Sequence, residues 1–275
     1  MPKILCFGEV LWDLLPSGKV LGGAPLNVTF RLNELKKDAL LISAIGTDAL
    51  GEEIKAAVKA LNVQAQIFEH PTLATGAVEV ALQADGSAKY RIKEPVAWDE
   101  IHYAGPSTAA LVFGSLALRS THNQQILDQL LAQAQPVFFD VNLRAPFYSI
   151  ELIEKYIAQS DLIKFNDEEF IWYASQQNWS SDLATSLEKF QKKYPDKSIC
   201  ITLGENGAIW GLDGQVFRAS APKIKVKDTI GAGDAFFAQL IAGYLAQNDP
   251  QQVLEAACAL GAKVASQAGA TQAAD

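Results

Sequence analysis

Long apolar runs and paired cysteines are missing from this sequence, and each absence excludes a class of protein. No stretch offers the roughly 18 consecutive apolar residues of a membrane span, and the apolar start Ile4–Phe7 is too short for a signal peptide. The cysteines are odd in number and lack CxxC spacing, which argues against a disulfide framework and a zinc site; they are Cys6, Cys200 and Cys258. We therefore expect buried thiols in a reducing compartment and a cytoplasmic protein with no membrane partner.

Basic charge is also scarce. Lysine and arginine total 23 against 31 aspartate and glutamate residues, which gives a net charge of −8. Nonspecific nucleic-acid binding needs a basic surface, so we expect no nucleic-acid partner, and any anionic ligand must be held by a local site. The motifs G-x-x-x-x-G-K-[ST], H-E-x-x-H and G-x-S-x-G are absent. The histidines lack the spacing of metal ligands, and we assign no chemistry to His70, His102 and His122.

The remaining composition is that of a globular protein with a substantial core: 275 residues, 49% of them hydrophobic and 20% charged. Short apolar runs alternate with segments of helical periodicity. The strand-like runs are 3–7, 39–45, 111–114, 137–141, 162–165 and 199–203, and the helix-like segments are 25–35, 50–61, 121–134, 149–159, 167–194, 232–247 and 250–267. This alternation predicts an α/β fold with a mostly parallel sheet and helices on both faces. We find no linker or internal repeat, so one domain over 1–275 is expected.

Two stretches depart from this rhythm and read as hairpins. From Val78 to Gln83 apolar and polar residues alternate, and Asp85-Gly86 then turns the chain toward Ile92. Such alternation is typical of strands with one solvent-facing side, so a half-exposed antiparallel hairpin is predicted. A second hairpin, over 208–219, is predicted at the edge of the main sheet.

A glycine-rich turn near the C-terminus carries the clearest chemical signal. Residues 228–234 read DTIGAGD and lead directly into an apolar helical run. Such a turn lets backbone N–H groups at a helix N-terminus approach an anion, which the helix dipole also favours. Asp234 is unexpected there, because a carboxylate repels phosphate unless it has a task such as accepting a proton. On these residues alone, an Asp cap on a buried helix is an equally good interpretation.

The turn resembles the D-T-x-G-A-G-D signature of the ribokinase-like (PfkB) carbohydrate kinases, and Gly22–Asn27, GGAPLN, resembles their N-terminal motif. The resemblance covers essentially the whole chain, and the segments Phe7–Asp13 and Glu94–Asp99 are most similar to the fructokinase branch. It implies a ribokinase-like fold with a small antiparallel β lid, made from about 14–21 and 73–98, over a bound sugar. In some relatives the lid also pairs two subunits, so a homodimer through the lid is one assembly that the resemblance implies.

The resemblance also implies roles for single residues. Asp234 would be the general base, the turn of Gly231, Ala232 and Gly233 an anion hole, and Arg144, just after an apolar strand, a triphosphate contact. The sugar would be held by Asp13, Gly22, Gly23 and Asn27. The nucleotide would contact Asn166, Thr202, Gly204 and Gly207. Glu169 would lie near Mg²⁺, through water, and K⁺ contacts are suggested at Asp228, Ile230 and Gly269. The family often has glycine shortly after its first helix, where this chain has Lys36-Lys37.

These assignments predict an ATP-dependent sugar kinase, most similar to fructokinases that phosphorylate the 6-hydroxyl of fructose, with ATP and Mg²⁺ as cofactors and K⁺ as a further candidate. Two alternatives stay open. One is a kinase for another small sugar, such as 2-keto-3-deoxygluconate or ribose. The other is a catalytically silent regulator that binds sugar or nucleotide, which would have no use for a base at position 234.

Overall fold

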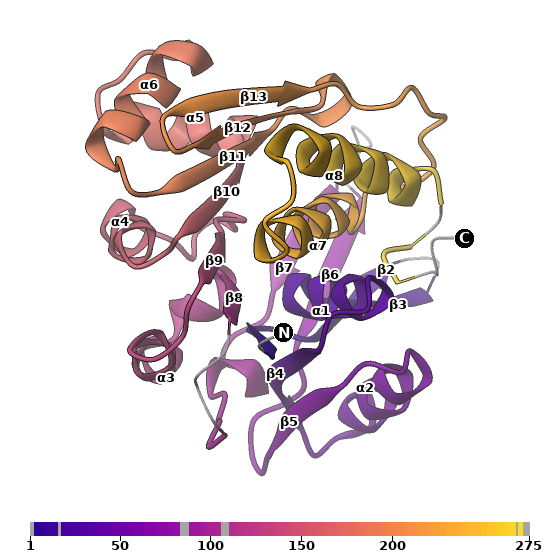
Figure 1. Cartoon of the computed structure of the whole chain (residues 1–275). Coiled ribbons are helices and arrows are strands. Elements are labelled where there is room, and N and C mark those ends of the chain that lie inside the picture. The colour runs from indigo at the N-terminus through magenta and orange to yellow at the C-terminus, as the bar shows by residue number, and fades with distance from the viewer. Residues whose placement is uncertain (1–2, 16–17, 83–87, 106–109, 268, 272–275) are drawn as a thin grey trace.

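The structure is a computed structural model that describes residues 3–15, 18–82, 88–105, 110–267 and 269–271. A nine-stranded sheet runs through the middle of the molecule (Figure 1). Each neighbouring pair of strands is parallel except the two pairs made by β12, which is antiparallel to β11 and β13. In spatial order the strands are β13 (Gln215–Ala219), β12 (Ala208–Leu212), β11 (Ser198–Thr202), β10 (Leu162–Asn166), β9 (Val137–Asp140), β8 (Ala110–Gly114), β1 (Ile4–Phe7), β4 (Ala39–Gly46) and β5 (Ala65–His70).

Helices cover both faces of this sheet, as the alternating pattern predicted. One face carries α1 (Ala24–Glu34), α2 (Ala49–Ala60), α7 (Ala232–Leu245) and α8 (Pro250–Ala265). The other carries α3 (Thr121–Leu131), α4 (Ile150–Ala158), α5 (Asp167–Gln176) and α6 (Leu183–Lys193). No helix of the described residues is both long and apolar enough to cross a membrane.

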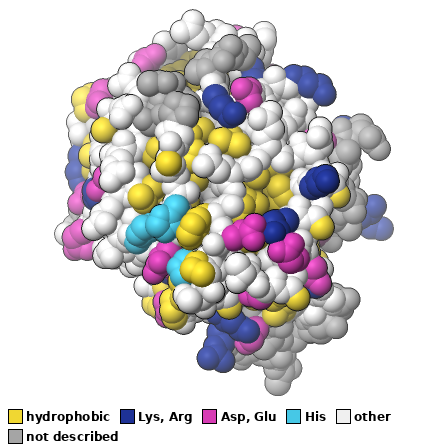
Figure 2. Space-filling model, turned by 90° about the horizontal axis from the view of Figure 1, so that it is seen from below, with side chains coloured by type: hydrophobic (Ala, Val, Ile, Leu, Met, Phe, Trp, Pro, Cys, Tyr) yellow, Lys and Arg dark blue, Asp and Glu magenta, His cyan; other side chains and the backbone are white. Residues whose placement is uncertain are grey.

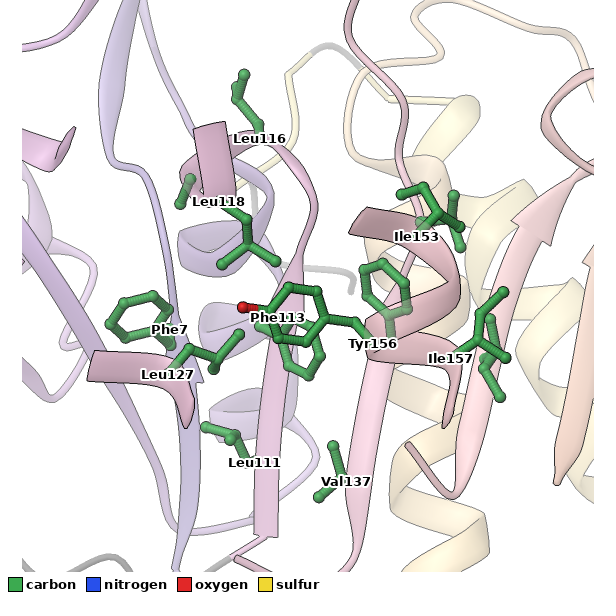
Figure 3. Close-up of a cluster of buried hydrophobic side chains, with 14 of the residues drawn as sticks. Phe7, Leu111, Phe113, Leu116, Leu118, Leu127, Val137, Ile153, Tyr156 and Ile157 are labelled. Atoms are coloured by element: carbon green, nitrogen blue, oxygen red, sulfur yellow. The ribbon is translucent and has the colours of Figure 1, made fainter. Parts of the chain in front are cut away.

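The central strands are apolar on both sides because both sides are covered. In β9, Phe138 packs toward α7 and α8, whereas Phe139 belongs to the opposite cluster, which includes residues of α3 and α4. Figure 3 shows part of that second cluster, with Phe113 and Tyr156 at its centre. The rings of Phe113 and Phe139 stack with centroids 4.8 Å apart. This two-sided packing fixes the strands whose ends carry the site.

A second, smaller sheet lies beside the main one, with strand order β3 (Gly18–Gly22), β2 (Leu11–Leu15), β6 (Ala77–Leu82) and β7 (Ala88–Ile92). The expected hairpin is confirmed, since β6 and β7 pair antiparallel, as β2 and β3 do. A parallel pairing of β2 with β6 joins the two hairpins. The predicted Asp85-Gly86 turn, and parts of both proposed lid segments, lie outside the described residues.

Two details differ from the sequence-based expectation. The segment 167–194 is not one helix, because α5 ends before Asn178, which takes a left-handed φ of 55°, and Asp182 caps a new helix by accepting the N–H of Thr185 at 2.8 Å. Strand β5 was not predicted. It lies at the edge of the sheet, and exposed polar residues interrupt its apolar pattern. Three short 3₁₀ turns complete the described structure: η1 (Ala97–Asp99), η2 (Leu116–Arg119) and η3 (Gly204–Asn206).

Candidate active site

The order of the strands marks the carboxyl ends of β1 and β8 as the place where a ligand is expected. From β1 the chain first builds outward through β4 and β5, and then continues on the other side of β1 with β8 through β13. Chain connections therefore diverge between β1 and β8, which is where open α/β sheets hold their ligands. Most of the predicted site residues lie in β2 and β3, at or just after the ends of β9, β10 and β11, and at the starts of α1 and α7.

The helix α7 begins at this edge in a form suited to an anion. Its N-cap is Gly231, with a left-handed φ of 77°, and a Cβ there would collide with Ala270, so glycine is required both for conformation and for space. The N–H of Ala232 donates to the Thr229 carbonyl at 3.2 Å. Among the described residues, the N–H groups of Gly233 and Asp234 in the first turn of α7 have no hydrogen bond and could donate to an anion, whereas the N–H of Ala232 is already engaged. The anion hole itself stays a prediction.

Asp234 is not a cap. The N-cap Gly231 has no side-chain partner, whereas Asp234 Oδ2 accepts a hydrogen bond from Asn27 Nδ2 at 2.8 Å. Burial and, to a smaller extent, the nearby Asp140 carboxylate raise the pKa of Asp234 to about 6, against the opposing effects of Asn27, Lys164 and Arg144. The carboxylate is thus held at the site by a residue of the other predicted motif, with a pKa close to neutrality.

The residues predicted to hold the sugar lie close together around Asn27. Its backbone N–H donates to the Gly23 carbonyl at 3.1 Å. At Gly22, an added Cβ would lie 2.5 Å from Asp13 Oδ2, and at Gly23, φ 116°, one would collide with the Glu9 carbonyl. Glycine at these two positions lets β3 and the start of α1 approach both acidic residues closely. The structure therefore brings Asp13, Gly22, Gly23 and Asn27 to one place, and that place adjoins Asp234.

Arg144 reaches the same edge from the loop after β9. Its positive charge lowers the pKa of Glu9, Asp13 and Asp234, although burial leaves all three above their usual values. The guanidinium is exposed to solvent and donates to the Leu143 carbonyl at 3.0 Å. The guanidinium can therefore bind an anion that approaches this edge of the sheet from solvent.

Glu169 holds the Arg144 loop in place. Its Oε1 accepts the N–H of Leu143 at 3.0 Å, and its Oε2 accepts the N–H of Asn166 at 2.8 Å in a reciprocal capping box that begins α5. Both carboxylate oxygens are therefore engaged by backbone. The described residues also contain no group of three or more acidic, His or Cys side chains that could hold a metal ion. This donor set fits a Mg²⁺ that takes most of its oxygens from phosphate and water. A contact of Glu169 with Mg²⁺ through water stays a prediction.

The predicted nucleotide residues lie next to one another at the ends of β10 and β11. Asn166 and Thr202 are opposite each other in the parallel register. Gly204 opens the following turn with a φ of 56°, and Gly207 has a φ of 97° in a position where a Cβ would collide with the Ala219 carbonyl. The backbone thus explains both glycines, and their nucleotide contact stays a prediction.

The residues suggested for K⁺ also come together. Asp228 Oδ1 accepts the N–H of Ile230 at 2.9 Å, and Asp228 Oδ2 accepts the N–H of Gly269 at 3.0 Å. Two chain segments about the N-terminus of α7 are therefore tied by one carboxylate. Cation binding at this position stays a prediction.

Two buried charged residues lie at the site without a role assigned from the sequence. Glu9 was expected at the ligand edge of the sheet, just after the first strand, whereas Lys164 was not identified. Glu9 is 3% exposed, and its Oε2 has no hydrogen-bond partner among the described residues; burial raises its pKa to about 7. Lys164 is 6% exposed, and its Nζ donates to Asp140 Oδ1 at 2.7 Å. A charge inside an otherwise apolar strand, as in the run LIKF of β10, is the signal that could have identified Lys164.

The chain is similar to known proteins over most of its length. A fructokinase of Rhizobium leguminosarum bv. trifolii is 27% identical over 271 residues, which cover 89% of this chain and 80% of that protein. A double-mutant fructokinase of Vibrio cholerae O395, solved with fructose, ADP and potassium, has a TM-score of 0.87 at 23% identity, covering 100% and 95% of the two chains.

A different substrate occurs on the same fold. The aminoimidazole riboside kinase of Salmonella enterica, solved with aminoimidazole riboside and an ATP analogue, has a TM-score of 0.81 at 22% identity and covers 99% of this chain and 96% of that one. Residues 17–275 match the family described as pfkB family carbohydrate kinase. The chain therefore belongs to the pfkB family and is a sugar kinase.

Proposed function

We propose that this protein transfers the γ-phosphoryl group of ATP to the 6-hydroxyl of fructose. The observation that carries the proposal is the hydrogen bond from Asn27 to Asp234, which joins the sugar-side motif to the helix N-terminus of the glycine turn. A sugar hydroxyl seated between these residues lies within reach of a carboxylate able to take its proton. The fructokinases among the relatives support fructose as the acceptor.

In the proposed reaction, Asp234 accepts the proton of the attacking hydroxyl while the oxygen attacks the γ-phosphorus in line with the leaving ADP oxygen. The N–H groups of Gly233 and Asp234 stabilise the negative charge on the transferred group. Arg144 contacts the triphosphate from the rim. When bound with ATP, Mg²⁺ supplies charge neutralisation on the phosphate oxygens, and Asn166 and Glu169 are the residues that would hold its water shell.

Sugar-dependent ADP release, measured with a coupled assay, tests the proposal. With Mg²⁺ and ATP, fructose should give a higher kcat/KM than ribose, 2-keto-3-deoxygluconate, fructose 6-phosphate or aminoimidazole riboside. A higher kcat/KM for one of the other four sugars would replace fructose as the substrate. A panel with no sugar-dependent ADP release in folded protein would favour the silent regulator instead.

A pair of variants controls for contaminating kinases. Asp234→Asn should abolish most of the sugar-dependent rate. Asp249→Asn is the matched control, because Asp249 caps the next helix, α8, by accepting the N–H of Gln252 at 3.0 Å. Asn caps helices about as well as Asp, so this control should keep its activity. The homodimer through the small sheet and the cytoplasmic location stay predictions; light scattering of the purified chain tests the first.

A further inference from the structure

A buried lysine lies at the centre of the candidate site, outside every motif that pointed to the family. Lys164 is the middle residue of β10, and its partner Asp140 is directly opposite it in the parallel register of β9 and β10. The two side chains form an ion pair of 2.7 Å in which both are almost fully buried. Because the sheet register aligns the two residues, the ammonium has a fixed place rather than a flexible one.

The neighbours of Lys164 place its ammonium beside the N-terminus of α7. Its Nζ lies 5.9 Å from the centroid of the Phe237 ring of α7, and a Cβ on Gly233 would lie 3.8 Å from the same Nζ. Gly233 is one of the two residues whose N–H groups are without a hydrogen bond among the described residues at this helix start. The ammonium therefore adds a full positive charge next to the partial positive charge of the α7 N-terminus.

Stability alone does not account for this pair. Removing two charges from water costs several kcal/mol per ion, and a buried ion pair can often be replaced by well-packed neutral side chains without loss of stability. β10 has apolar residues on both sides of Lys164, and a methionine would fill a similar volume. The charge itself is the property that needs an explanation.

The charges around Asp234 come from every element that faces it. Asp140 on β9 raises its pKa, whereas Asn27 on α1, Lys164 on β10 and Arg144 in the loop after β9 lower it. Glu9, after β1, is a further neighbour, because the Asp234 charge raises its pKa. Arg144 is exposed, so solvent and salt weaken its effect, whereas the field of the buried Lys164 is less screened.

Lys164 itself stays charged in this environment. Burial lowers its pKa, but the carboxylates of Asp140, Glu169 and Asp234 outweigh burial and leave it above its usual value. Its neighbour on β11, Cys200, is a neutral thiol, since burial raises the pKa of that group. One buried cation thus faces three carboxylates contributed by β9, α5 and α7.

We propose that Lys164 is a positioning residue for phosphoryl transfer, which holds Asp140 in the sheet and offsets negative charge around Asp234 so that this carboxylate is an ionised proton acceptor at neutral pH. The inference rests on the proposed function for its catalytic meaning. Its electrostatic content, the effect of Lys164 on Asp234, is a property of the protein without ligands and can be measured separately.

The test follows the Asp234 carboxyl group directly. In protein labelled with ¹³C at the aspartate carboxyl carbons, the Asp234 signal is assigned by its loss in Asp234→Asn and titrated without ligands. Lys164→Met should move the titration midpoint up by about one pH unit, and Asp140→Asn should move it down, because each removes a charge of opposite sign near Asp234. The acid limb of kcat/KM should shift in the same two directions.

Controls separate this effect from a loss of folding. Lys155→Met removes the lysine of an exposed ion pair with Asp128, also 2.7 Å long, and should leave the midpoint unchanged. Lys164→Arg keeps the charge and should return the midpoint toward that of the native chain. If Lys164→Met fails to fold, Lys164→Gln takes its place, since a glutamine amide can still donate to Asp140 but carries no charge.

The outcomes are distinct. Opposite shifts in Lys164→Met and Asp140→Asn support the proposal. A folded Lys164→Met or Lys164→Gln variant with an unmoved Asp234 midpoint overturns it and leaves the pair a structural one. If the native chain shows no sugar-dependent ADP release, the proposed function fails, but the carboxyl titration still reports whether Lys164 acts on Asp234.

Discussion

At the scale of single residues, the side chain that separates the possible functions is Asp234. Its carboxylate binds Asn27 rather than capping α7, so the interpretation as a helix cap does not agree with the structure. Asp234, Asn27 and the glycines were predicted as site residues because each lies in a short stretch that resembles a motif of the carbohydrate kinase family. That resemblance assigned no role to Glu9, whose burial depends on the assembled fold, and it did not identify Lys164, whose partner Asp140 lies on another strand.

We predict that Asp234→Asn lowers kcat by about 10²–10⁴-fold, because it removes the proton acceptor and keeps the shape. ATP affinity should hold or improve, since one negative charge near the triphosphate is lost. Steady-state kinetics and nucleotide titration measure both. Near-native turnover in the folded variant would remove Asp234 from the mechanism.

In the native chain, the rate should decline as the pH falls through about 6, where Asp234 becomes protonated.

At the scale of elements, the helix ends show how far local patterns reach. The helices α2, α4 and α6 begin at Asp48, Ser149 and Asp182, each of which caps its helix as a favoured side chain. The end of α1 was harder to read. There the N–H of Lys37 donates to the Leu32 carbonyl, and the N–H of Lys36 donates to the Asn33 carbonyl. These two bonds form a Schellman motif in which Lys36 has a left-handed φ of 58°.

We predict that Lys36→Gly stabilises the protein by about 0.5–1 kcal/mol, because glycine adopts this left-handed conformation without the steric cost of a Cβ. The greater backbone entropy of glycine in the unfolded chain offsets only part of this gain. Urea denaturation measures the change. Lys59→Gly is the control, because Lys59 is an exposed residue inside the last turn of α2, where glycine should destabilise by a similar amount. Equal effects of both substitutions would contradict the role of the left-handed φ.

The small sheet carries a second prediction at this scale. We expect β6 and β7 to act as a lid, because a kinase must exclude water from its phosphoryl group and the paired hairpins lie next to the sugar-side residues of β2 and β3. Saturating fructose should slow hydrogen exchange in 77–82 and 88–92, with little change in the buried strand β9. Equal exchange with and without sugar would count against a lid.

At the scale of the whole molecule, the fold class followed from the alternation of strands and helices, and the structure confirms it. The order of the strands did not follow, because it depends on where each unit docks rather than on its own pattern. Strand β5 and the break between α5 and α6 also escaped prediction. The first is an edge strand with polar residues, and the second depends on the left-handed conformation of Asn178, which local composition does not fix.

The pH dependence of the free energy of unfolding tests the effect of the buried Glu9 carboxyl group. Burial raises the pKa of Glu9 from 4.5 to about 7. Folding raises the pKa of this carboxyl group, so the group contributes fully to the stability of the folded protein only at a pH below its pKa in the unfolded chain. The contribution is lost as the pH rises through the pKa of the group in the folded protein. Glu9→Gln should therefore stabilise the protein by as much as about 3 kcal/mol at about pH 8.

The gain from Glu9→Gln should fall below about 1 kcal/mol at about pH 5, where the native carboxyl group is protonated. Denaturant unfolding of both proteins at the two pH values measures the difference. The exposed Glu188→Gln serves as control and should show no such dependence. A gain that is equal at both pH values would mean that the charge of Glu9 does not oppose folding.

The contact between Asn27 and Asp234 joins positions 207 residues apart. During synthesis the ribosome makes the proposed sugar-binding residues first, the proposed nucleotide-binding residues next and the proposed proton acceptor Asp234 last. A growing chain would therefore hold both substrate-binding parts before it can react. Closing so long a loop is among the slower events of folding. Phosphoryl transfer is therefore a late property of the chain, and during refolding it should return after the buried Trp210 of β12 has regained its native fluorescence.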